Sequence, residues 1–128
     1  MYSYVGKRRF PFHWIEAKEH EKQKEWFIKQ IDLANELGLP VSVHARDATQ
    51  DTYEILRDHP VAKGGVLHCY SGSTEMLKKF AKLGFYFGFD GPITYKGSIV
   101  PKENVKECPV DRILSETDSP YLTPVPFR

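Results

Sequence analysis

Cysteine is scarce in this chain, which excludes a fold held together by disulfides. Cys69 and Cys108 are the two cysteines among 128 residues, and neither belongs to a close Cys pair of the kind that binds zinc. We expect both to be small buried residues. So little cysteine is typical of a reducing compartment, the cytoplasm by default or the nucleus of a eukaryotic cell.

Long apolar runs and an excess of one charge are also missing. No apolar run approaches the ~20 residues that a membrane span needs, and the residues after Met1 lack the pattern of a signal peptide. We therefore expect no membrane partner. The formal net charge is +1, so binding to nucleic acid would depend on a local site rather than on overall charge.

Amphipathic helical segments alternate with short apolar runs along the chain. The longest predicted helix covers residues 18–37 and carries one core-facing stripe, made of Phe27, Ile31, Ala34 and Leu37. Gly38 would end it in the left-handed conformation. Asp47 and Ser73 are the candidate caps of the next two helices, and a short helix is expected after Pro101.

Strands are predicted at residues 41–44, 66–70, 85–89 and 113–115. Strands that alternate with helices imply βαβ units and a parallel sheet. A complete eight-stranded (β/α) barrel needs about 250 residues, so this chain has room for roughly half of one, with open sheet edges. The predicted fold class is therefore α/β, a partial TIM-type barrel in one domain of residues 1–128.

Three of the predicted strands are followed by groups that can bind metal or catalyse: His44, His68 and Asp118. The carboxyl ends of strands in a parallel βα array share one rim, where active sites are built. Two imidazoles and a carboxylate suit Mg²⁺, Mn²⁺ or Zn²⁺, and such an ion lowers the pKa of a bound water toward ~7. A structural role for each residue taken singly is the alternative.

Two further features at this rim suit an anion. Arg46 lies two residues past His44, and its guanidinium matches a phosphate oxygen, although an ion pair with Asp47 is an equally simple interpretation. Ser71 and Ser73 flank a glycine before a helix, where backbone N–H groups can hold a phosphate. The alternative there is an ordinary capped turn.

Five segments together resemble the TatD family of metal-dependent hydrolases: residues 39–48, 65–73, 83–95, 109–114 and 116–122. The resemblance runs in the same order from about Glu21 to Arg128. It implies a metal-dependent, exonuclease-like deoxyribonuclease on an amidohydrolase-like TIM barrel, with DNA as the substrate. It also implies that His44, His68 and Asp118 are metal ligands, that Asp118 is in addition the catalytic base, and that Glu116 supports the site.

The chain departs from the family's pattern near its start. No segment supplies the His-x-His pair of the family's first barrel strand. Residues 5–14 resemble a degraded copy of a later strand, so residues 1–16 are expected to form a degraded strand and linker before the βα units of 17–128. In that copy Lys7 replaces a metal-binding glutamate and Pro11 an aspartate, and a charged ammonium repels a cation.

Two other functions stay open on these residues. A truncated and inactive half-barrel would act by association, either with a complementing N-terminal half or with a second copy of itself. A metal-dependent amide or ester hydrolase of the same barrel class would use similar ligands.

Overall fold

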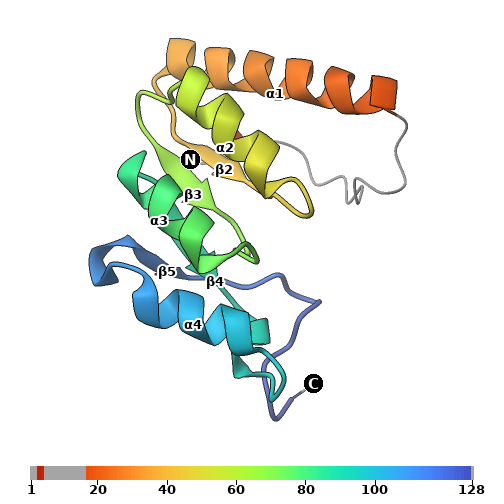
Figure 1. Ribbon diagram of the computed structural model, residues 1–128, viewed down its shortest axis with the longest axis vertical. Helices are drawn as coiled ribbons and strands as arrows, with labels where there is room; N and C mark the ends of the chain where they lie inside the picture. Colours follow the sequence, from red (N-terminus) through yellow and green to blue (C-terminus); the bar gives the residue numbers. More distant parts are fainter. Residues whose placement is uncertain (1–2, 5–16, 128) are drawn as a thin grey trace.

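A computed structural model of the chain describes residues 3–4 and 17–127 (Figure 1). Its elements, in chain order, are β1 (Ser3–Tyr4), α1 (Ala17–Leu37), β2 (Val41–Val43), α2 (Thr49–Asp58), β3 (Gly65–Leu67), α3 (Thr74–Lys82), β4 (Tyr86–Phe89), the 3-10 helix η2 (Gly91–Thr94), α4 (Ile99–Glu107), the 3-10 helix η3 (Val110–Arg112) and β5 (Ile113–Ser115).

The strands form one parallel sheet in the order β1-β2-β3-β4-β5. Val41 of β2 is in register with Gly65 of β3, and Phe87 of β4 with Ile113 of β5. The helices follow one another beside the sheet in the order of the strands that they connect (Figure 1). This is the arrangement of roughly half a (β/α) barrel, so the predicted fold class is confirmed. Besides the four strands predicted between residues 41 and 115, the sheet includes β1, which lies within residues 1–16, where a degraded strand was expected.

The core lies between the helices and the sheet and is centred on Phe80 of α3. The rings of Tyr53, Tyr70 and Phe85 pack edge-on against it, with centroid separations of 5.6 to 6.4 Å. Edge-to-face pairs at such distances are favourable because the ring edges are positive and the faces negative. This cluster joins α2, α3 and the start of β4, so it holds the middle of the half-barrel together.

The predicted helix over 18–37 is α1, but its apolar stripe is only partly buried. Ile31 and Ala34 are fully in the core, whereas Leu37 is 59% exposed. The expectation for Leu37 was therefore wrong, since this side chain lies outside the core. Trp26 and Leu33 are also exposed, and with Leu37 they form a second apolar stripe at helical spacing.

The ends of the helices confirm some of the predicted caps and correct others. Gly38 has a φ of 65°, as expected for a left-handed end. Ser73 caps α3, its Oγ accepting the N–H of Met76 at 3.2 Å. Asp47 does not cap α2: it has a φ of 57° itself, and the helix begins only at Thr49, without a side-chain cap.

The start of α4 differs slightly from the prediction. The helix expected after Pro101 begins at Ile99, so the proline lies in the first turn, where its missing N–H is not needed. Residues 5–14, with Lys7 and Pro11, lie outside the described residues. Across the described part of the chain, no helix is both long and apolar enough to span a bilayer.

Candidate metal centre

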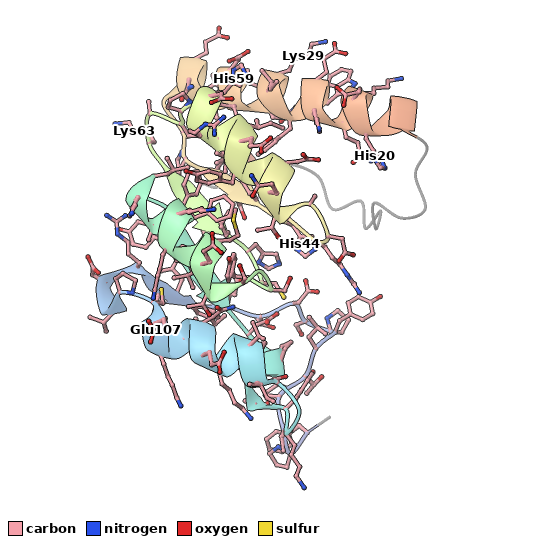
Figure 2. All side chains as sticks on the ribbon, in the orientation of Figure 1. His20, Lys29, His44, His59, Lys63 and Glu107 are labelled. Atoms are coloured by element: carbon pink, nitrogen blue, oxygen red, sulfur yellow. The ribbon has the colours of Figure 1, made fainter. Side chains whose placement is uncertain are left out.

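The three predicted metal ligands meet at the carboxyl ends of the strands. His44 follows β2, His68 follows β3 and Asp118 lies three residues beyond β5. His68 Nε2 is 3.6 Å from Asp118 Oδ1, and the rings of His44 and His68 are 5.8 Å apart. Figure 2 shows His44 near the loops that lead into α2 and α3, while His59 and Glu107 mark the opposite ends of the helices.

Glu116 contacts His68 at Nδ1, the ring nitrogen that does not face Asp118. Its Oε1 lies 2.9 Å from His68 Nδ1 and also accepts the backbone N–H of Cys69. The carboxylate fits there because residue 88 is glycine, and a Cβ at Gly88 would collide with it. With Nδ1 donating to Glu116, the imidazole presents Nε2 toward Asp118, which is how a carboxylate orients a metal-binding histidine.

The electrostatics of His68 follow from these contacts. The hydrogen bond to Glu116 raises the pKa of His68 above its ordinary value, against the opposing effect of burial, and the charges of Glu116 and Asp118 add to the increase. Without a cation, this environment stabilises the imidazolium. The same negative surroundings attract a metal ion that replaces the proton.

The donors fit a divalent cation as a partial ligand set. Two ligand atoms bound to one ion at ~2.1 Å in tetrahedral geometry are about 3.5 Å apart, close to the 3.6 Å between His68 Nε2 and Asp118 Oδ1. In the described ranges, however, no three His, Cys, Asp or Glu side chains are arranged to hold an ion by themselves. His44 faces His68 without completing such a set.

Asp90 is a site residue that the sequence analysis did not identify. It follows β4 directly, so it stands at the same rim as His68 and Asp118, and it is 7% exposed. The rule used for the other strand ends applies to this one too, but the sequence analysis applied it only to His44, His68 and Asp118. Burial is the main cause that raises the pKa of its carboxyl group.

Cys69 lies beside Asp90 and is only partly buried, unlike Cys108, which is buried as expected. Its Sγ is 3.4 Å from Asp90 Oδ1. Burial is the largest cause that raises the pKa of the Cys69 thiol to about 12. The Cys69 thiol therefore donates to Asp90 Oδ1.

The predicted phosphate-binding residues occupy the same rim but have other partners as well. Arg46 has a side chain that is 65% exposed, with Nε 3.8 Å from a carboxylate oxygen of Asp47. Two side chains fix the backbone of the loop that holds Ser71 and Ser73. Tyr70 Oη donates to the Ser73 carbonyl and Asn104 Nδ2 donates to the Gly72 carbonyl, each at 2.8 Å. Ser71 itself is exposed.

Two bacterial proteins are similar to this chain in sequence. The chain is 46% identical over 125 residues to the uncharacterized metal-dependent hydrolase YabD of Bacillus subtilis, which covers 97% of this chain and 49% of that protein. It is also 46% identical over 108 residues to YcfH of Escherichia coli, another uncharacterized metal-dependent hydrolase, with 84% and 41% covered.

A solved structure agrees with these sequence matches. The TatD homologue YjjV from Escherichia coli superposes with a TM-score of 0.76 at 28% identity, over 84% of this chain and 42% of that one. The chain thus spans half or less of the length of these relatives. The model of the family described as TatD related DNase matches residues 2–128, and the chain belongs to this family.

Proposed function

We propose that this chain provides the C-terminal part of a metal-dependent deoxyribonuclease site, with DNA as the substrate. The observation that carries the proposal is the row of Glu116, His68 and Asp118, in which one carboxylate orients the imidazole toward a second carboxylate. Such a row is typical of a metal-binding histidine in a hydrolase. The family's description as related to DNase supports the substrate class.

Each residue has a distinct role in this proposal. His44, His68 and Asp118 would hold a divalent cation, with the remaining ligands coming from residues outside this set. The chemistry that such a cation would supply is polarisation of a phosphate oxygen and a lower pKa, toward ~7, for a water. Asp118 orients the attacking water and takes its proton, and Glu116 keeps Nδ1 of His68 protonated.

The substrate contacts come from the outer part of the rim. Arg46 pairs with a phosphate of the DNA, because its guanidinium is exposed and its contact to Asp47 is long, with Nε 3.8 Å from Oδ2. The backbone N–H groups around Ser71 and Ser73, at the start of α3, hold another phosphate oxygen.

Association with another chain is the second candidate function. The exposed stripe of Trp26, Leu33 and Leu37 on α1 favours it. A half-barrel that is inactive alone would then complete its ligand set with a complementing half. The amide or ester hydrolase of the same barrel class is the third candidate.

The test compares the chain alone with a restored protein. The restored protein carries an upstream segment with His-x-His and has a glutamate in place of Lys7. Each protein is incubated with 3′-labelled linear DNA and with Mg²⁺ or Mn²⁺. Cleavage is expected from the restored protein, with a loss of ~10²–10⁴-fold or more in Asp118→Asn. Asp111→Asn removes an exposed carboxylate elsewhere and serves as the control.

Two results would contradict the proposal. Cleavage that survives Asp118→Asn unchanged would refute the role of Asp118. Hydrolysis of p-nitrophenyl acetate without hydrolysis of bis-p-nitrophenyl phosphate would favour the amide or ester hydrolase instead.

A further inference from the structure

Asp90 carries a buried oxygen that the half-barrel itself does not use. It stands at the end of β4, between β3 and β5, the strands that lead to His68 and Asp118. Oδ1 lies 3.4 Å from the thiol of Cys69, which donates to it. Oδ2 is buried and has no hydrogen-bond partner among the described residues.

This placement is unfavourable for a residue that only supports the fold. A buried acceptor without a partner destabilises the folded state, because it has lost the hydrogen bonds that water made to it. Burial is the largest cause that disfavours a charge on Asp90, and Glu116 and Asp118 repel that charge as well, whereas the hydrogen bond from Cys69 and the charge of His68 favour it. A cation would reverse this balance.

The cation need not bind Asp90 directly. Across the described residues, no three acidic, histidine or cysteine side chains lie together closely enough to ligate one ion. Mg²⁺ usually keeps several of its waters when it binds a protein. A water of this kind is the partner that the Oδ2 atom lacks.

We infer that Asp90 is a positioning residue of the cation site, whose Oδ2 accepts a hydrogen bond from a water of the hydrated cation held by His68 and Asp118. The inference rests on the cation site of the proposed function but not on DNA as the substrate. The thiol of Cys69 donates to Oδ1, so Oδ2 is the oxygen left to accept from this water.

The experiment measures metal binding and stability on the full chain. Mn²⁺ is titrated into the wild type, Asp90→Asn, Asp118→Asn and Asp32→Asn, and free Mn²⁺ is followed by its electron paramagnetic resonance signal. Thermal melts are recorded in EDTA. Asp32 is an exposed carboxylate on α1 and controls for the loss of one negative charge.

Asp90→Asn is expected to weaken Mn²⁺ binding about 10–100-fold, the usual loss when a group that supports a metal ligand is removed. It should also raise the melting temperature in EDTA, because a neutral amide replaces a buried carboxylate whose Oδ2 has no partner among the described residues. Asp32→Asn should change neither. A residue with only a structural role would not combine weaker binding with a more stable metal-free fold.

The other outcomes overturn the inference in distinguishable ways. If Asp118→Asn weakens Mn²⁺ binding and Asp90→Asn does not, the cation site stands and Asp90 has no part in it. If Asp90→Asn fails to fold or melts below the wild type in EDTA, Asp90 is a structural residue. Absence of Mn²⁺ binding by the wild type would remove this inference together with the proposed cation site in this chain.

Discussion

His68 and Glu116 are joined through one carboxylate oxygen: Oε1 lies 2.9 Å from His68 Nδ1 and also accepts the N–H of Cys69. Glu116, the residue that follows β5, therefore fixes both the ring of His68, which follows β3, and the backbone of Cys69. The orientation of His68 depends on the pairing of β4 with both of these strands, and not on β3 alone.

The His68–Glu116 pair should make the stability of the metal-free chain depend on pH. Because the folded-state pKa of His68 is raised, its contribution is complete below the unfolded value of about 6.5 and is lost as pH rises through the folded value. In EDTA, the melting temperature of the wild type should therefore fall from pH 6 to pH 8. In His68→Asn this part of the fall should be absent, and an unchanged slope would contradict the assignment.

Gly88→Ala should weaken metal binding by displacing the carboxylate of Glu116. The added Cβ collides with the carboxylate of Glu116, and this end of a flexible side chain can swing away. His68 then loses the partner of Nδ1, which should weaken Mn²⁺ binding about 10–100-fold. Gly97→Ala is the matched control, since a Cβ there meets nothing within 4 Å. Equal Mn²⁺ affinities in the two variants would show that the position of Glu116 does not matter.

Phe80→Ala should lower the free energy of unfolding by about 3–5 kcal/mol, the usual range for removing a buried ring. Phe80 is fully buried, and it touches the rings of Tyr53, Tyr70 and Phe85. Urea denaturation measures the effect, with Val110→Ala at an 88% exposed residue as the control. A loss below 1 kcal/mol would mean that the cluster is not the centre of the core.

The chain alone should self-associate through its uncovered apolar faces. Trp26, Leu33 and Leu37 form an exposed stripe on α1, and apolar patches of this kind promote association. Sedimentation velocity should show dimers or larger species, and Leu33→Gln with Leu37→Gln should shift the population toward the monomer. Val110→Gln, at an exposed residue on η3, should not. A monomeric wild type with a sharp melt at high temperature would exclude this behaviour.

The sequence by itself determined the order of the elements and the rim on which the chemistry lies. Residue spacing of 3.6 marks helices, and short apolar runs between them mark buried strands, because both patterns depend on neighbours a few positions away. The strand at residues 113–115 and the cap at Ser73 were predicted for this reason. The shared rim of His44, His68 and Asp118 follows from the parallel order of the strands alone.

Only the tertiary structure decided which atoms meet at that rim. The approach of Glu116 to His68 depends on the register across β3, β4 and β5 and on the space above Gly88, which no local pattern encodes. The burial of Asp90 likewise depends on the elements packed around it. Asp47 lost its predicted role as a cap because its backbone adopts a left-handed turn two residues before α2. Contacts between residues some 20 to 50 positions apart arise from packing, and packing is a property of the whole fold.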